Sequence, residues 1–176
     1  MEKTIRKTSQ SVVDQILGYC PDLLSPKILE PSAGEGDLVE GILREIPTAN
    51  IDCIELNKEK RDILKEKGFN VVGEDFLEII PIDIGTYDII IACPTYKNNI
   101  DVEHIKHMYK FLNVGGILIS LTSPFWTVRN EEHQVKFREW LEDKDYNMVM
   151  LKDNSFIENY KTQPSMIIKI YKNVVF

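Results

Sequence analysis

A near-continuous apolar segment in the middle of the chain, YDIIIAC at residues 87–93, most strongly limits the possible folds. A strand with so few polar positions is typical of a parallel sheet that is covered on both faces. Other short apolar segments lie at 27–30, 51–56, 70–76, 115–123, 146–151 and 165–171. Segments with helical spacing of apolar residues lie at 9–20, 37–46, 58–68, 101–112 and 129–141. This alternation predicts an α/β fold with a doubly wound, mostly parallel, seven-stranded sheet.

The last two predicted strands have no helical segment between them. Residues 152–164 are too few and too polar for an ordinary crossover helix, which a parallel connection needs. We therefore expect these two strands to form an antiparallel C-terminal hairpin at the sheet edge.

Length and charge narrow the class of protein further. The 176 residues match a single domain, 1–176, with a core large enough to need no disulfide or metal. The formal net charge of −7 argues against binding to nucleic acid by bulk electrostatics, although a local basic patch stays compatible with it. Three cysteines without C-x-x-C spacing predict no metal site. With no apolar signal or membrane-length segment, we expect a cytoplasmic protein without membrane contact.

The first candidate ligand site is ILEPSAGEGDLVEGI at residues 28–42. We expect a strand to end at Glu30, a turn through Gly34 and Gly36, and a helix from about Asp37. Glycines let the backbone approach a ligand closely, and a helix start offers unpaired N–H groups. The third glycine of the G-x-G-x-x-G dinucleotide pattern is missing, so a plain strand–turn–helix junction is an equal alternative.

Two acidic positions follow at the ends of the next strands. Glu55 lies 21 residues after Gly34, close to the spacing at which such folds place an acid on a ribose diol. Asp75 and Phe76 end the third strand, where they suit an adenine amino group and its ring. Each acid alone is as well explained as a helix N-cap or a solvated loop end. Together, at the carboxyl ends of successive strands, they favour a nucleoside site.

The motif ACPTY at residues 92–96, at the end of the most buried strand, adds a resemblance to these features. The chain resembles the class I S-adenosylmethionine-dependent methyltransferases, which have a Rossmann-like sheet, and within them the branch that includes adenine-N6 DNA methyltransferases. The resemblance implies S-adenosyl-L-methionine as cofactor, a ribose contact at Glu55 and an adenine contact at Asp75 and Phe76. It implies that the residues of the nucleoside-binding loop are Glu30, Pro31, Ser32, Ala33, Gly34 and Gly36.

The same resemblance extends over essentially the whole chain. The segment around Thr8 is similar to the motif that contacts the methionine end of the cofactor, and residues 155–171 resemble the last hairpin of the family. The implied catalytic motif is Cys93-Pro94-Thr95-Tyr96. The family has an amide, carboxylate or hydroxyl at the position of Cys93 and a second proline at that of Thr95. A thiol is a weak acceptor for an amine hydrogen, so Cys93 would orient the amine poorly. Two other interpretations of Cys93 are that it is a nucleophile or that it is simply a small buried residue at the strand end.

Aromatic and basic residues in the later loops are candidates for substrate binding. Trp126 is either a stacking platform for a base or a lid over the core, and Phe156 lies in the loop before the last strand. The predicted phosphate contacts are Lys97, Arg129 and Lys161. His104 and His107 share a helix face without completing a metal set, and we expect that face to be solvated.

The predicted function is methyl transfer to an exocyclic amine, with adenine N6 of DNA as the acceptor and the base flipped into the site. Because we expect a single domain without a separate target-recognition domain, a protein partner is a candidate source of target recognition. Alternatives are a protein glutamine or RNA methyltransferase, and a catalytically weak cofactor-binding interaction protein.

Overall fold

The computed structural model describes residues 8–94, 100–151, 157–158, 161–162 and 165–173. Its helices are α1 (Gln10–Leu17), α2 (Asp37–Glu45), α3 (Lys58–Glu66), α4 (Pro81–Ile84), α5 (Ile100–Lys110) and α6 (Glu132–Leu141), with short 3-10 helices η1 (Phe76–Glu78) and η3 (Pro124–Thr127). Its strands are β1 (Lys27–Glu30), β2 (Asn50–Ile54), β3 (Asn70–Gly73), β4 (Tyr87–Ala92), β5 (Leu112–Thr122), β6 (Asp145–Met150), β7 (Ile157–Glu158), β8 (Lys161–Thr162) and β9 (Met166–Tyr171).

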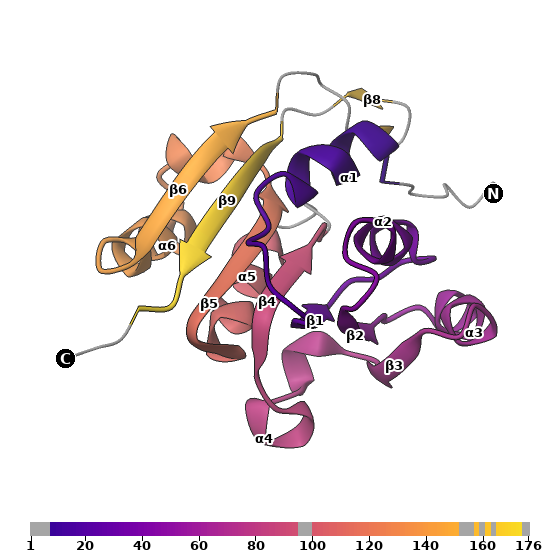
Figure 1. The fold of residues 1–176 in the computed structure, drawn as a ribbon. Coiled ribbons are helices and arrows are strands. Elements are labelled where there is room, and N and C mark those ends of the chain that lie inside the picture. The colour runs from indigo at the N-terminus through magenta and orange to yellow at the C-terminus, as the bar shows by residue number, and fades with distance from the viewer. Residues whose placement is uncertain (1–7, 95–99, 152–156, 159–160, 163–164, 174–176) are drawn as a thin grey trace.

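Seven of these strands form one sheet in the order β3-β2-β1-β4-β5-β9-β6, which confirms the predicted fold class (Figure 1). Strands β1 to β5 pair in parallel, so their carboxyl ends lie at one edge of the sheet. Strand β9 lies between β5 and β6 and is antiparallel to both, as predicted for the C-terminal hairpin. The short strands β7 and β8 pair only with each other and were not predicted.

The central strand β4 is buried on both faces, as its apolar sequence predicted. Ile89 and Ile91 belong to one core cluster, with residues of α1, α2 and α3. Ile90 belongs to the other cluster, with residues of α5 and α6. Figure 1 shows α5 and α6 behind the sheet and α1 on its near side. The alternation of side chains along one strand therefore divides the core into two layers.

Several elements end earlier or begin later than their apolar patterns suggested. Helix α1 stops at Leu17 because Gly18 caps it. Helix α6 begins only at Glu132 because the chain first forms η3, with Pro124 at its start. Helix α4 has four residues, too few for a helical period to be visible in the sequence.

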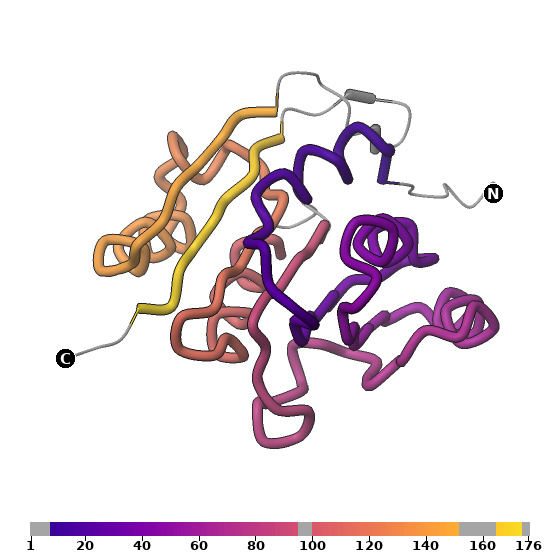
Figure 2. Tube along the Cα trace, in the orientation of Figure 1, coloured from indigo at the N-terminus to yellow at the C-terminus, as the bar shows by residue number. Residues whose placement is uncertain are grey.

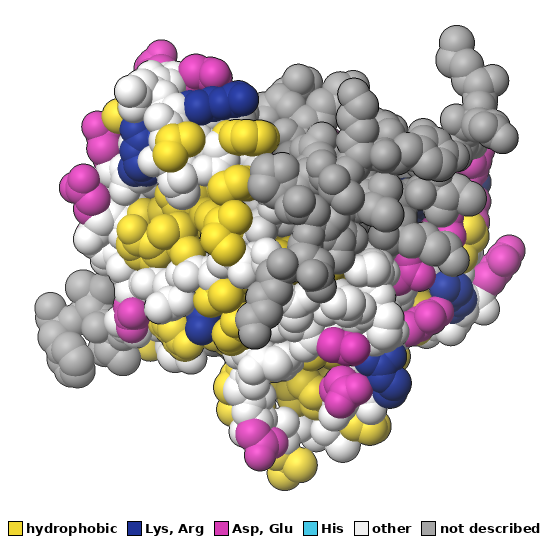
Figure 3. All heavy atoms as spheres, turned by 90° about the horizontal axis from the view of Figure 1, so that it is seen from above, with side chains coloured by type: hydrophobic (Ala, Val, Ile, Leu, Met, Phe, Trp, Pro, Cys, Tyr) yellow, Lys and Arg dark blue, Asp and Glu magenta, His cyan; other side chains and the backbone are white. Residues whose placement is uncertain are grey.

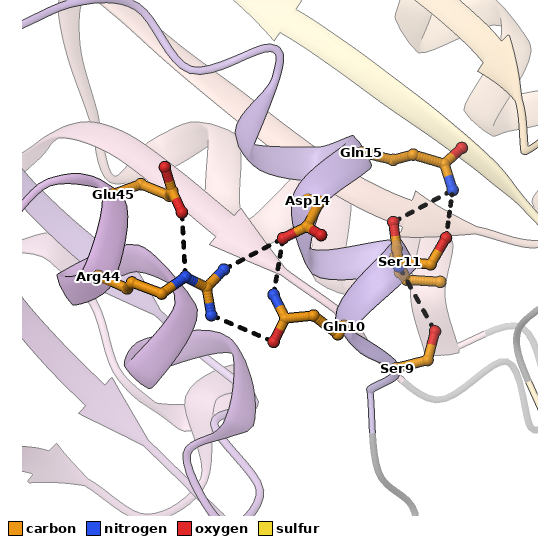
Figure 4. A network of polar contacts seen from close by, with 8 residues as sticks. Ser9, Gln10, Ser11, Asp14, Gln15, Arg44 and Glu45 are labelled. Atoms are coloured by element: carbon orange, nitrogen blue, oxygen red, sulfur yellow. Dashed lines mark hydrogen bonds and ion pairs between the residues drawn. The ribbon is translucent and has the colours of Figure 1, made fainter.

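Helix α1 packs directly against α2, and from its end the chain runs across the molecule to the start of β1 (Figure 2). Figure 4 shows the polar part of this contact, in which Arg44 of α2 donates to Gln10 at 3.1 Å and to Asp14 at 3.1 Å. The apolar part depends on Gly41, because a Cβ there would lie 2.3 Å from Cγ1 of Val13. The missing side chain lets the two helices approach, which holds Thr8, just before α1, beside the site described below.

We expect Gly41→Ala to destabilise the fold by roughly 1–3 kcal/mol, because the added methyl overpacks the α1–α2 contact. Gly18→Ala is the matched control, since Gly18 has φ −60° and an added Cβ would meet nothing closer than 3.5 Å. Urea unfolding measures both. Val13→Ala should offset part of the Gly41→Ala cost, and purely additive free energies would contradict the proposed clash.

Candidate functional site

A cavity of about 350 Å³ opens at the carboxyl ends of the first strands of the sheet. Ten of the residues predicted for the site border it: Thr8, Glu30, Pro31, Ser32, Ala33, Gly34, Glu55, Asp75, Phe76 and Cys93. Their order along the chain shows that the segment before α1, the β1–α2 loop and the ends of β2, β3 and β4 all contribute. The fold therefore brings together residues as far apart in sequence as Thr8 and Cys93, which are 85 positions apart.

The β1–α2 loop is shaped by two glycines in the left-handed region. Gly34 has φ +59° and Gly36 has φ +96°, conformations that disfavour other residues. A Cβ on Gly34 would meet no atom within 4 Å, so this part of the loop is open to a ligand. Gly36 differs: it is buried at the start of α2, where a Cβ would lie 2.6 Å from the ring of Phe69. It does not border the cavity, and its role is to shape the loop.

Glu55, at the end of β2, holds this loop in place. One carboxylate oxygen accepts the N–H of Gly34 at 2.8 Å, and the other accepts the N–H of Asn57 at 2.8 Å. The Ala33 N–H also donates to the carbonyl of Ile54, at 3.0 Å. A carboxylate has about four acceptor positions, so Glu55 retains acceptor capacity for hydroxyl groups of a ligand.

Arg61, which the sequence did not single out, ties the ends of β2 and β3 together. It is buried and donates to the carbonyls of Glu55 at 2.9 Å and Leu56 at 2.6 Å. Its other terminal nitrogen lies 2.9 Å from the carboxylate of Glu74. Within a helix of alternating charges, nothing in the sequence distinguishes Arg61 except its i, i+3 spacing to the buried Leu64.

Glu30, at the end of β1, is fully buried beside the cavity. Burial raises the pKa of its carboxyl group from 4.5 to about 8; the donors of Ser32 oppose this shift, and the nearby charge of Glu55 adds to it. The N–H and hydroxyl of Ser32 donate to one oxygen at 2.9 and 3.1 Å. At neutral pH the group is therefore mostly protonated, and it will ionise more readily beside a cationic ligand.

Asp75 and Phe76 form the adjoining wall. Asp75 caps η1 by accepting the N–H of Leu77 at 3.0 Å, and it also borders the cavity. The residue is therefore an N-cap, as the alternative interpretation predicted, and at the same time lies at the predicted site. The Phe76 ring is buried between helix α5 and the sheet, and its centroid lies 4.8 Å from that of His107 and 5.6 Å from that of His104.

The prediction of a solvated face for His104 and His107 is wrong. Nε2 of His107 lies 2.8 Å from the carbonyl oxygen of Ile79, and His104 borders the cavity. Both residues lie on the side of α5 that packs against η1. The spacing Ile100, His104, Phe111 places His104 on the buried face of the helix, a signal that its polar side chain masked.

Cys93 and Pro94 follow β4, where Cys93 borders the cavity and Pro94 is buried. The rest of the predicted catalytic motif, Thr95 and Tyr96, lies outside the described residues, as do Lys97 and Phe156. Lys161 lies in β8, and its side chain is also outside the described part.

Trp126 lies in the core, which matches the second of its two predicted roles. Only 3% of the residue is exposed, its ring meets Phe137 edge-on at 4.8 Å, and its Nε1 donates to Thr122 at 3.1 Å. Arg129 is exposed, with its guanidinium 4.4 Å from the ring centroid of Phe125. Neither Trp126 nor Arg129 is among the described residues that border the cavity.

The cavity wall is strongly acidic. Among its described residues, one is a lysine, Lys60, and six are acidic: Glu30, Glu35, Asp37, Glu55, Glu74 and Asp75. Figure 3 shows acidic and basic side chains mixed on the right of the molecule, where α2 and α3 lie in Figure 1, and hydrophobic ones grouped on the left.

The described residues contain no cluster of three or more possible metal ligands. No described helix is long and apolar enough to cross a membrane.

Comparison with known proteins identifies the fold. A precorrin-6y C5,15-methyltransferase from Geobacter metallireducens matches with a TM-score of 0.69 at 19% identity, over 98% of this chain and 94% of that one. An S-adenosylmethionine-dependent methyltransferase from Clostridium acetobutylicum matches with 0.66 at 14% identity, over 95% and 93%. The chain has the class I methyltransferase fold. S-adenosyl-L-methionine is the cofactor expected for this fold.

Two further proteins are similar to this chain over smaller shares of their own length. A modification subunit of a proposed type I restriction enzyme from Vibrio vulnificus matches with a TM-score of 0.75 at 14% identity, over 95% of this chain and 44% of that one. A release factor glutamine methyltransferase from Rhodopirellula baltica is 23% identical over 115 residues, 61% of this chain and 39% of that protein. This chain thus spans about two fifths of the length of that relative. No protein-family model matches the chain.

The raised pKa of Glu30 predicts a pH dependence of stability. Between about pH 4.5 and 8 the unfolded chain has released this proton while the folded chain retains it, so the free energy of unfolding falls as pH rises. The decline approaches 1.4 kcal/mol per pH unit at most and stops above pH 8.

Glu30→Gln should remove this decline of the free energy of unfolding with pH. Glu66→Gln, at an exposed position of α3, should leave the decline unchanged. Urea unfolding between pH 5 and 9 measures the difference. Parallel pH profiles for the parent chain and Glu30→Gln would contradict the assignment.

Proposed function

We propose that the chain is an S-adenosylmethionine-dependent methyltransferase that modifies an exocyclic amine, with adenine N6 of DNA as the acceptor. One observation carries the proposal: the glycine loop, Glu55, Asp75 and Cys93 border a single cavity at the carboxyl ends of parallel strands. Open α/β sheets bind their ligands at this edge.

The cavity suits this cofactor in both charge and hydrogen bonding. S-adenosylmethionine carries a sulfonium and an ammonium group, and the acidic lining attracts both. The remaining acceptor positions of Glu55 suit the ribose hydroxyls, and the oxygen of Asp75 not bonded to Leu77 suits the adenine amine. Thr8 borders the cavity, where its hydroxyl suits the methionine end.

The chemistry asked of the protein is mainly one of positioning. Bound S-adenosylmethionine supplies an electrophilic methyl group, and the acceptor amine must present its lone pair in line with it. In the proposed site the carbonyl of Pro94 accepts one amine hydrogen, Cys93 accepts the other weakly, and Tyr96 stacks on the flipped base. Thr95 replaces a proline of the family motif without adding a group that this step requires.

DNA is the favoured acceptor because of the resemblance at residues 93–96, supported by the similarity to the restriction-enzyme modification subunit. Since the net charge is −7, contact with phosphates has to be local, and Lys97, Arg129 and Lys161 are the proposed contacts. A protein partner that supplies target recognition is part of this proposal.

A protein glutamine amide is the second candidate acceptor, favoured by the similarity to the release factor glutamine methyltransferase. A glutamine amide, like adenine N6, presents a planar nitrogen with two hydrogens. The same orienting groups therefore serve either acceptor, and the surface around the cavity has to discriminate between them.

The proposed cofactor contacts predict how binding responds to mutation. Glu55→Ala and Asp75→Ala should each weaken binding of S-adenosylmethionine by ~1–3 kcal/mol, since each leaves polar groups without a partner. Asp62→Ala, which removes an exposed carboxylate paired with Lys58, is the control. Calorimetry measures all three, and circular dichroism verifies their folding. Undiminished affinity in both site variants would refute the proposed cofactor site.

The orientation of the amine predicts an order of rates. Cys93→Ala should lower the methylation rate only slightly, because the thiol is a weak acceptor. Tyr96→Ala should raise the activation free energy by ~1–3 kcal/mol, because stacking on the base is lost. Cys93→Asn restores an amide acceptor and should maintain or raise the rate. Single-turnover methylation measures this order.

Two results would contradict this account of the amine. Loss of all turnover in Cys93→Ala, with a trappable covalent adduct on a fluorinated pyrimidine, would show a nucleophilic cysteine. Equal absence of turnover in the parent and all three variants, with cofactor still bound, would favour a non-catalytic interaction protein.

A further inference from the structure

His104 borders the proposed cofactor cavity close to Asp75 and Phe76, yet no feature of the sequence assigned it a role there. Its imidazole meets the ring of Phe76 with centroids 5.6 Å apart and planes at 60°. Ile100, one turn earlier on α5, borders the same cavity. The residue therefore belongs to the wall that would enclose the nucleobase.

The ring of His104 is neutral, and one of its nitrogen atoms has no hydrogen-bond partner among the described residues. Burial, the larger cause, and the nearby His107 together lower its pKa from 6.5 to about 4, and Asp75 opposes the shift. Its Nδ1 is buried and has no hydrogen-bond partner among the described residues. A buried polar atom without a partner is costly and requires an explanation. A ligand in the cavity that His104 borders would supply one.

His107 shows what a structural histidine looks like on the same helix. It also meets Phe76 edge-on, but its Nε2 lies 2.8 Å from the Ile79 carbonyl oxygen and fixes α5 to the segment after η1. His104 has no such backbone contact in the described part of the chain. His107 therefore has a structural role in packing, whereas the ring of His104 still has an N–H group available to a ligand.

The polar groups around this part of the cavity complement one edge of adenine. Asp75 offers only acceptors, and one oxygen already takes the N–H of Leu77. A neutral imidazole offers one N–H donor, and rotation about its terminal torsion changes which ring atom faces the cavity. Adenine presents an amine donor beside ring-nitrogen acceptors. A 6-oxopurine has a carbonyl acceptor in place of the amine and an N–H donor at N1, while its N3 and N7 remain acceptors.

We infer that His104 determines nucleobase specificity by donating its N–H to a ring nitrogen of the cofactor's adenine while Asp75 accepts from the amine. This inference rests on the proposed function, since it concerns the same cavity and cofactor. If the contact is to N1, His104 also rejects a 6-oxopurine analogue, whose N1 carries a hydrogen; a contact to N3 or N7 leaves that rejection to Asp75. In either case His104 acts on binding without a part in methyl transfer.

Calorimetry with analogues of S-adenosylhomocysteine tests this contact atom by atom. The ligands are S-adenosylhomocysteine, its 1-deaza, 3-deaza and 7-deaza forms, each lacking one ring nitrogen, and the inosine analogue. The parent chain should bind one deaza form about 5- to 10-fold more weakly than S-adenosylhomocysteine, the loss expected for one hydrogen bond. His104→Phe should bind S-adenosylhomocysteine with a similar loss and no longer distinguish that deaza form.

Glu103→Gln is the matched control, an exposed position on the same helix, and should behave as the parent chain. If His104→Phe does not fold, His104→Asn, which keeps a donor near the position of Nδ1, should retain the discrimination at least in part. Equal affinity of the parent chain for all three deaza forms, or unchanged discrimination in His104→Phe, overturns the inference while the proposed function stands. Failure of the parent chain to bind any of the five ligands overturns both.

Discussion

The hydrogen bond between the Glu55 carboxylate and the N–H of Gly34 is the interaction on which the rest of the site depends. It joins the loop after β1 to the end of β2, and Arg61 extends the connection to Glu74 after β3. Without these ties, three loops at the edge of the sheet would move independently, and the cavity between them would lose its shape. The same carboxylate is the proposed ribose contact, so one side chain both builds the site and serves it.

The electrostatics of the cavity explain how an acidic chain suits its proposed ligand. Six carboxyl groups face one lysine among the described lining residues, and burial keeps Glu30 mostly protonated at neutral pH. A ligand whose sulfonium and ammonium groups outweigh its one carboxylate relieves this repulsion, and it favours ionisation of Glu30. Acidity that opposes general binding to nucleic acid therefore favours the cofactor, and phosphate contacts are left to the few basic residues outside the cavity.

Sequence patterns predicted the strands, the turn at Gly34 and the acids Glu55 and Asp75, because these depend on local periodicity and on strand ends that meet at one edge. The roles of Arg61 and His104 were not predictable in the same way. Both are polar residues on helices. Arg61 is buried because α3 packs beside β3, and His104 is half-buried because α5 packs against η1. Trp126 shows the reverse: its position after β5 suited the site, but its bond to Thr122 and its contact with Phe137 place it in the core.

The central claim is methyl transfer to an exocyclic amine from a cofactor held at the carboxyl edge of the sheet. The most direct measurement is mass spectrometry after incubation of the chain with methyl-deuterated S-adenosylmethionine and a mixture of DNA, RNA and glutamine-containing peptides. The account predicts deuterated methyl groups on adenine N6 of DNA. Label on a glutamine amide or on RNA would contradict the choice of acceptor, and the absence of any labelled product while the cofactor is bound would contradict the claim of catalysis.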